Sequence, residues 1–126
     1  MSILVVIEHD RGTLADASLE ALAFGRSIAD QLGTSVEALL IGADAAGLAD
    51  VCAAHGATTC HLAPMSGEYS PEAYGAVIAE ASPALSPSGI VACGTDRGNE
   101  VLAHAAAELD LPFVANCTDV KTADEW

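Results

Sequence analysis

The sequence has almost no lysine and few basic residues of any kind. Four lysines and arginines stand against 18 aspartates and glutamates, the formal net charge is -14, and Lys121 is the only lysine. A chain this acidic is repelled by nucleic acids and by anionic membranes, so we expect neither as a partner. The acids are dispersed, which is typical of a salt-adapted surface whose self-repulsion is screened at high ionic strength. We infer a halophilic source; an ordinary acidic surface is the alternative.

Long apolar runs and aromatic residues are also scarce. No run approaches the roughly 18 residues of a membrane span, and the apolar residues 3–7 lack the basic flank of a signal peptide. Aromatic residues make up 4% of a chain that is 52% hydrophobic, so small aliphatic side chains must supply the core. We expect a soluble, cytoplasmic protein, and 126 residues suffice for a single domain.

The four cysteines show no CxxC spacing, and the four histidines are not spaced as metal ligands. Cys60, Cys93 and Cys117 stand among apolar neighbours, which predicts small buried residues in a reducing compartment. We therefore expect no metal site. His55 is interpreted as a packed residue at the end of a helix.

Segments with strand and helix patterns alternate along the chain. Continuous apolar runs are typical of strands buried on both faces, and the intervening segments have helical periodicity. Gly33 is placed to end the first helix, and Pro83 and Pro87 to end the third. The predicted strands are residues 3–7, 36–41, 58–62, 90–93 and 113–117. The predicted helices are residues 16–32, residues 44–55, a segment from residue 71 to Pro83 and Pro87, and a segment after Gly98.

The first predicted helix has an irregular apolar face. Leu19, Leu22, Ala23 and Leu32 share one broad face, whereas Ile28 falls off it. We therefore expect this helix to be covered on more than one side.

Single helices between strands predict a parallel sheet with right-handed crossovers. The expected architecture is a three-layer α/β/α sandwich, Rossmann-like and of the adenine-nucleotide α-hydrolase type, with five mainly parallel strands in the order 3-2-1-4-5. The topological switch point then falls between the first and fourth strands. This arrangement places Glu8–Gly12 beside Gly94–Gly98 at the carboxyl edge of the sheet.

The loop from Gly94 to Glu100 is the strongest candidate for a ligand site. It follows a strand and opens a helix, which is where open α/β sheets commonly bind anions. Gly94 and Gly98 permit tight turns, and Thr95 offers a hydroxyl donor. With Asn99, these residues form a weak candidate site for an anionic cofactor group.

The same loop also carries features that oppose phosphate binding. It lacks the lysine of a P-loop and the GxGxxG spacing of a dinucleotide site. Asp96 and Glu100 add negative charge, and Arg97 compensates only one of them. We favour the interpretation that the glycines shape the turn and that Asp96 or Asn99 caps the helix.

Glu8, His9 and Asp10 follow the first strand, and a catalytic interpretation would make His9 a general base. Because no nucleophile with a clear motif accompanies it, we assign no catalytic residue.

Several short motifs occur in a characteristic order along the whole chain. Together they resemble the N-terminal domain of the electron transfer flavoprotein alpha subunit, the FixB-like family. The matching segments are Ile3–Asp10, Ala17–Leu22, Ala54–Ala57, Pro71–Tyr74, Gly94-Thr95 with Gly98–Glu100, and Thr118–Val120. One departure is that Arg97 precedes Gly98, whereas the family commonly has an arginine after this glycine.

The resemblance implies a heterodimer of alpha and beta subunits that carries FAD and often AMP. Such proteins pass electrons from dehydrogenases toward a membrane quinone reductase. The family holds FAD mainly in the alpha subunit's C-terminal domain and AMP in the beta subunit, so the N-terminal alpha domain is implied to be a non-catalytic scaffold. Residues 116–126 contain no stop signal, so we expect residues 1–126 to be one domain of a longer alpha subunit.

Two other functions remain open. A universal-stress-type module that binds adenine nucleotides has the same topology and a glycine-containing loop after the fourth strand. A hydrolase or lyase of adenine nucleotides ranks last, because the chain lacks a phosphate loop.

Overall fold

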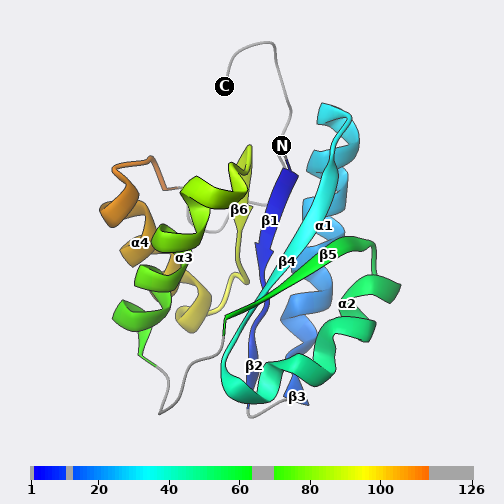
Figure 1. The fold of residues 1–126 in the computed structure, drawn as a ribbon, viewed down its shortest axis with the longest axis horizontal. Helices are drawn as coiled ribbons and strands as arrows, with labels where there is room; N and C mark the ends of the chain where they lie inside the picture. Colours follow the sequence, from blue (N-terminus) through cyan, green and yellow to red (C-terminus); the bar gives the residue numbers. More distant parts are fainter. Residues whose placement is uncertain (1, 11–12, 64–69, 114–126) are drawn as a thin grey trace.

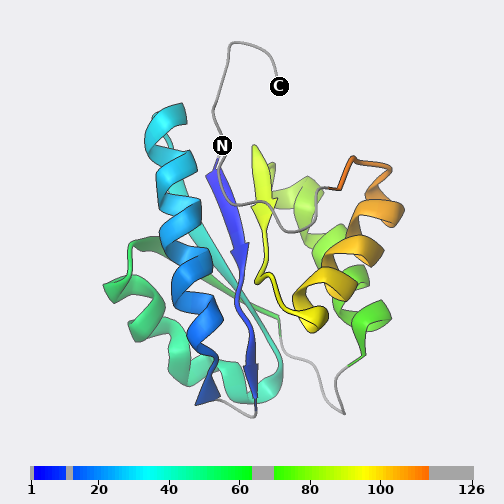
Figure 2. The same cartoon turned by 180° about the vertical axis from the view of Figure 1, so that it is seen from behind.

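The computed structural model describes residues 2–10, 13–63 and 70–113 and has a parallel sheet between two layers of helices (Figure 1). The strands β1 (Ser2–Val6), β4 (Ser35–Ile41), β5 (Ala57–Ala63) and β6 (Gly89–Val91) are arranged in the order β5-β4-β1-β6. One face carries α1 (Asp16–Leu32), the 3-10 helix η1 (Ala43–Leu48) and α2 (Ala49–Ala54), and the other carries α3 (Pro71–Leu85) and α4 (Asp96–Leu109), as Figure 2 shows from behind. The predicted three-layer α/β class is confirmed.

Strand β1 lies at the centre of the core. Ile3 and Val5 pack in the cluster formed with α1 and α2, whereas Leu4 and Val6 pack in the cluster formed with α3 and α4. Both faces of the strand are therefore covered, which explains why its sequence is a continuous apolar run.

The predicted order of the first four strands is confirmed, but the described sheet has four strands instead of five. Strand β1 pairs in parallel with both β4 and β6, so the switch point lies between β1 and β6 as expected. Phe113, the first residue of the predicted fifth strand, is not in a strand, and residues 114–117 lie outside the described residues.

The segment after β1 contains two further short strands. His9–Asp10 forms the short strand β2, which pairs antiparallel with β3 (Thr13–Leu14). Strands of two residues are too short to produce a detectable alternation of polar and apolar side chains.

Three helix boundaries also differ from the prediction. The helix expected over residues 44–55 begins as η1 and becomes α-helical only at Ala49. Helix α3 continues past Pro83 to Leu85 and ends where Ser86 adopts a left-handed φ of 45°. A proline in the last turn removes a single helical hydrogen bond, so the left-handed residue, not Pro83, ends the helix. Helix α4 starts at Asp96, two residues before Gly98.

The predicted apolar face of α1 was only partly right: Leu22 is buried and Leu19 and Leu32 are half-buried. Ala23 is exposed and Ile28 is buried, and the buried face also includes Ser18 and Gly25. A Cβ built on Gly25 would lie 2.7 Å from a methyl group of Val5, so the glycine lets α1 approach the sheet closely. The face has regular helical spacing, but two of its members are not hydrophobic.

Candidate functional site

The carboxyl ends of β1 and β6 meet at the switch point, and the loops that follow them are in direct contact. Thr95 Oγ1 donates a hydrogen bond to Glu8 Oε1 at 2.6 Å. Arg97 Nη1 donates to the backbone carbonyl of His9 at 3.1 Å. The predicted proximity of Glu8–Gly12 and Gly94–Gly98 is therefore confirmed.

Thr95 is the N-cap of α4. Its backbone is extended, and its side-chain oxygen accepts a hydrogen bond from the Gly98 amide at 3.0 Å. Our expectation that Asp96 or Asn99 caps this helix was wrong. A threonine hydroxyl both accepts and donates, so Thr95 satisfies a helix amide and binds the Glu8 carboxylate at the same time.

The two loop glycines differ in their structural roles. A Cβ on Gly98 would lie 2.0 Å from the carbonyl oxygen of Cys93, so only glycine fits in this first helical turn. A Cβ on Gly94 would meet no atom within 4 Å, and Gly94 has no positive φ. Gly98 therefore shapes the loop, whereas nothing in the structure requires glycine at position 94.

The backbone of Glu8 is tied to the start of α1 through Ser18. The Ser18 hydroxyl donates to the Glu8 carbonyl at 2.9 Å and accepts from the Glu8 amide at 2.8 Å. It also lies 3.6 Å from Cys93 Sγ, and burial raises the pKa of the Cys93 thiol. The Ser18 hydroxyl on α1 therefore links Glu8, which follows β1, with Cys93, which follows β6.

His9 is buried, with 6% of its surface exposed. Its Nε2 lies 2.7 Å from the Ile41 carbonyl oxygen, and because a carbonyl can only accept, we assign the proton to Nε2. This nitrogen therefore anchors the loop to the end of β4 instead of facing a reactant. The ring also lies against Gly42, where a Cβ would be 3.4 Å from it.

These contacts determine what the start of α4 can bind. In open α/β domains an anionic ligand lies at such a helix N-terminus, where backbone amides and the helix dipole favour negative charge. Here the Gly98 amide is used by Thr95, the Thr95 hydroxyl is used by Glu8, and the Asn99 amide donates to the Thr95 carbonyl. The Glu8 carboxylate therefore supplies an anion from within the protein. From the sequence, we expected Asp96 and Glu100 to supply the negative charge that disfavours a phosphate. Both side chains are exposed.

Arg97 is the basic side chain of this loop, and it is engaged within the protein. Besides its bond to the His9 carbonyl, its guanidinium lies 5.5 Å from the centre of the Tyr74 ring on α3. It therefore links the switch-point loop to the neighbouring helix.

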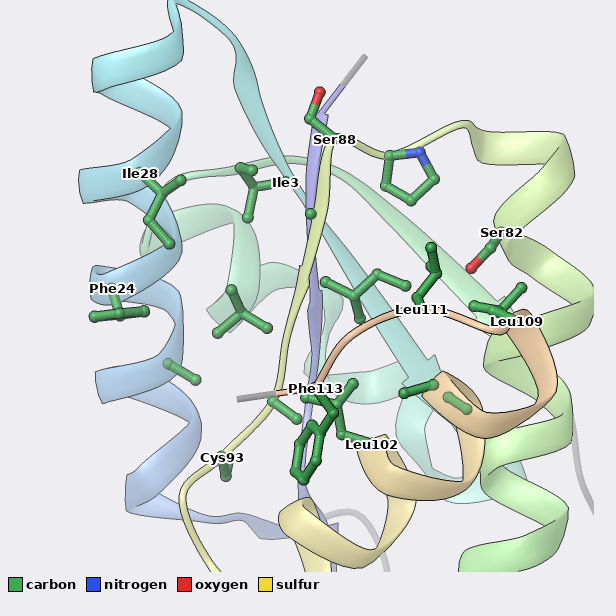
Figure 3. Close-up of a pocket in the computed structure, with 18 of the residues that line it drawn as sticks. Ile3, Phe24, Ile28, Ser82, Ser88, Cys93, Leu102, Leu109, Leu111 and Phe113 are labelled. Atoms are coloured by element: carbon green, nitrogen blue, oxygen red, sulfur yellow. The ribbon is translucent and has the colours of Figure 1, made fainter. Parts of the chain in front are cut away.

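A groove of about 960 Å³ lies along the outer edge of β6 (Figure 3). One wall carries Phe24 and Ile28 from α1, and the opposite wall carries Leu102 and Leu109 from α4. Glu20 is the only acidic or basic residue among its described lining residues. The sequence alone does not predict this groove, although the spacing of Leu102 and Leu109 on α4 indicates an apolar surface.

The remaining cysteines and histidines do not form a metal site in the part of the chain described. Cys52 and Cys93 are buried and Cys60 is half-buried, whereas Cys117 lies outside the described residues. Burial raises the pKa of Cys52 to about 11, so its thiol stays protonated at neutral pH. His55 is exposed at the end of α2 instead of packed. Among residues 2–10, 13–63 and 70–113, no three His, Cys, Asp or Glu side chains gather to hold a metal ion.

Within the same described ranges, no helix combines the length and the apolar character needed to cross a membrane.

The layers, the strand order and the switch-point loops define a Rossmann-like α/β domain. Its sequence matches the model of the electron transfer flavoprotein domain over residues 3–126, and the chain belongs to this family. The chain is 32% identical to the electron transfer flavoprotein subunit alpha of Megasphaera elsdenii, covering 98% of this chain and 37% of that protein. It is also 32% identical to protein FixB of Clostridium saccharobutylicum, covering 94% of this chain and 36% of the relative.

A eukaryotic relative is also covered over only part of its length. The probable mitochondrial electron transfer flavoprotein subunit alpha of Caenorhabditis elegans is 30% identical, covering 99% of this chain and 37% of that protein. The chain therefore spans little more than a third of the length of these relatives.

Proposed function

We propose that this chain is a non-catalytic scaffold domain of an electron transfer flavoprotein alpha subunit. In this proposal it is the N-terminal domain of a longer cytoplasmic subunit that pairs with a beta subunit. The heterodimer passes electrons from dehydrogenases to a quinone reductase of the respiratory chain through FAD held elsewhere, and the beta subunit holds AMP. The observation that carries the scaffold role is that the Gly98 amide and the Thr95 hydroxyl at the α4 N-terminus are engaged by Thr95 and Glu8 of the same chain.

The described residues do not fit the diphosphate of FAD. At the start of α4, the Glu8 carboxylate already accepts the hydrogen bond that Thr95 could offer to a phosphate. The groove beside β6 has no arginine, lysine or histidine among its described lining residues. Phosphate groups need such cations or free backbone amides, so in this proposal the described residues of the domain do not hold the diphosphate.

The absence of nucleotide binding can be tested by calorimetric titration of this chain with AMP, ATP and FAD in molar salt. The proposal predicts no binding in the micromolar range for any of the three. Micromolar binding of AMP or ATP would overturn the scaffold role and favour a universal-stress-type module. Micromolar binding of FAD would contradict the assignment of the flavin to another part of the heterodimer.

The partner can be tested separately by mixing the chain with the beta subunit of the same organism and measuring molar mass by light scattering. We expect a stable one-to-one complex. Failure to associate at micromolar concentrations, by a chain shown to be folded by circular dichroism, would contradict a scaffold that acts against the beta subunit.

A further inference from the structure

Two free thiols lie together on the face of the sheet that carries α1 and α2. Cys52 belongs to α2 and Cys60 to β5, and this helix packs against this strand (Figure 1). Cys52 is fully buried in the core cluster of this face, and the half-buried Cys60 packs against the same cluster. The turn at His55–Gly56 joins the two elements, so the pair lies on either side of a short connection.

The two thiols meet beside the backbone carbonyl of Ala49. Cys60 Sγ donates to this carbonyl oxygen at 3.6 Å, and Ala49 precedes Cys52 by one turn of α2. A side chain in a helix reaches the carbonyl oxygen three residues before it, so the Cys52 side chain lies next to the same carbonyl. The Cys52 and Cys60 thiols are also hydrogen-bonded to each other. The pair is therefore in direct contact where α2 meets β5.

The two thiols differ in how readily they can react. Burial is the main influence on both and raises both pKa values, that of Cys52 to about 11. The hydrogen bond between them raises the pKa of Cys52 further and lowers that of Cys60, as expected when the Cys52 thiol donates to the Cys60 sulfur. Cys60 is also the more exposed of the two. Cys60 is therefore the thiol that a reagent from solution meets first, and Cys52 is the protonated thiol behind it.

We propose that Cys52 and Cys60 are a redox-sensitive pair that closes to a disulfide bond between α2 and β5. The oxidant is a small soluble disulfide. The Cys60 thiolate attacks one of its sulfur atoms, the S–S bond breaks, and one small thiolate leaves and takes up the proton that Cys60 lost. Cys52 then loses its proton and attacks Cys60 Sγ, and the second small thiol leaves with that proton. The protein loses two electrons and two protons, and the oxidant becomes two thiols.

The disulfide ties the last turn of α2 to β5, which is an edge strand of the described sheet. In a reducing compartment the pair stays as two thiols, and it closes when oxidised small thiols accumulate. The site is therefore a modification site that responds to the thiol–disulfide balance around the protein. It is independent of the scaffold function, because it depends only on side chains within this domain.

The direct test is oxidation of the folded chain with hydroxyethyl disulfide at about pH 8, near the ordinary pKa of a cysteine. The chain is then unfolded in iodoacetamide, which blocks the remaining free thiols, and is digested with trypsin without reduction. Both cysteines fall in one peptide, Ser27–Arg97, which also contains Cys93. We expect this peptide to have lost two hydrogen atoms and to carry iodoacetamide on Cys93 alone.

Three other results of this experiment would overturn the proposal. Iodoacetamide on Cys52 or Cys60 would show that the thiols stay free. A hydroxyethyl group retained on either cysteine at the end of the reaction would show that the second thiol cannot reach the first. A bond from either cysteine to Cys93, or to a second copy of the chain, would show that the pair is not the preferred partner of itself.

Single variants test the order of the two steps, with circular dichroism to show that each is folded. In Cys52→Ala we expect the reaction to stop with a hydroxyethyl group on Cys60. In Cys60→Ala we expect Cys52 to be modified at least about tenfold more slowly than Cys60 is in Cys52→Ala, because Cys52 is buried. Cys93→Ala is the control and should close the Cys52–Cys60 bond as the unmodified chain does. Equal rates in the first two variants would contradict the proposal. If a variant does not fold, the peptide mass from the unmodified chain still decides the question.

Discussion

The Thr95 hydroxyl connects two loops that are 87 residues apart in the chain. It donates to Glu8 Oε1 at 2.6 Å and accepts from the Gly98 amide at 3.0 Å, so one side chain caps α4 and binds the end of β1. The two strands joined in this way, β1 and β6, flank the switch point of the sheet. This contact joins the two loops at the carboxyl edge and engages the Gly98 amide at the position where related folds bind anions.

Thr95→Val should lower the free energy of unfolding by about 2 kcal/mol, because it removes both the helix cap and a hydrogen bond to a carboxylate. Thr95→Ser keeps the hydroxyl and is the matched control, with an expected loss below about 0.5 kcal/mol. Urea unfolding at constant salt measures both values. Equal stability of the valine and serine variants would show that the hydroxyl contributes nothing.

Gly98→Ala should destabilise the domain by about 3 kcal/mol or more, because the new Cβ would lie 2.0 Å from the Cys93 carbonyl oxygen and the backbone would have to move. Gly94→Ala in the same loop is the control. It has open space and no positive φ, so we expect no loss, or a gain of up to about 1 kcal/mol. Urea midpoints compare the pair, and a larger loss at position 94 than at 98 would contradict the geometry of this loop.

The fold could be predicted from the sequence where burial follows hydrophobic side chains. The alternation of apolar strands with single helices was sufficient for the order of the first four strands, and Gly33 was sufficient for the end of α1. The face of α1 could not be predicted, because Ser18 and Gly25 are buried for reasons that hydrophobicity does not measure. Ser18 is buried because Glu8 satisfies its hydroxyl, and Gly25 because α1 packs closely on Val5.

The place where the two loops meet at the carboxyl edge of the sheet was predicted from the sequence, but the side chains that make the contacts there were not. Parallel strands bring their carboxyl ends to one edge, so the contact between the Glu8 and Gly94–Gly98 segments followed from topology alone. Which side chain caps α4, and which carboxylate meets it, depends on side-chain directions across the sheet that local patterns do not contain. Thr95 is therefore the cap that the sequence suggested for Asp96 or Asn99, and Glu8 supplies the negative charge that it suggested for Asp96 and Glu100.

The double variant Asp96→Lys with Glu100→Lys tests whether surface charge alone keeps nucleotides away. Because Glu8 and Thr95 fill the start of α4 and both replaced residues are exposed, we expect no micromolar binding of AMP or ATP by calorimetry. Adding Glu8→Gln to the double variant removes the internal carboxylate charge and serves as the comparison. Binding by the double variant alone would show that the fold retains a pocket that its surface charges keep empty.

The stability of the domain should depend on Glu37 at acidic pH. The Ser2 hydroxyl and then His61, whose Nε2 lies 2.5 Å from Glu37 Oε1, lower the pKa of this carboxyl below its ordinary value of 4.5. A carboxyl whose pKa is lower in the folded state stabilises the fold above the unfolded-state pKa, and this contribution is lost as the pH falls through the folded-state pKa. As the pH is lowered below 4.5, the free energy of unfolding should therefore fall more steeply in the wild type than in Glu37→Gln.

Urea midpoints measured from neutral pH downward would show this difference, and Glu108→Gln on the exposed side of α4 is the control variant. Its profile should follow the wild type. Parallel profiles for the wild type and Glu37→Gln would show that the Glu37–His61 pair does not contribute to folding stability.

The dispersed acidic surface should make the domain more stable in concentrated salt. With a net charge of -14 and only four lysines and arginines against 18 aspartates and glutamates, the folded chain repels itself. This repulsion acts over about 10 Å at 0.1 M salt but only about 3 Å at 1 M. We expect the thermal midpoint to rise steadily from about 0.1 M to about 2 M KCl, the range over which this screening length shrinks. Asp96→Asn with Glu100→Gln and Glu108→Gln removes three exposed charges, and it should raise the midpoint at low salt and flatten its salt dependence. A midpoint that stays constant or falls with KCl would mean that this is an ordinary acidic surface, because self-repulsion would then not limit the stability of the fold.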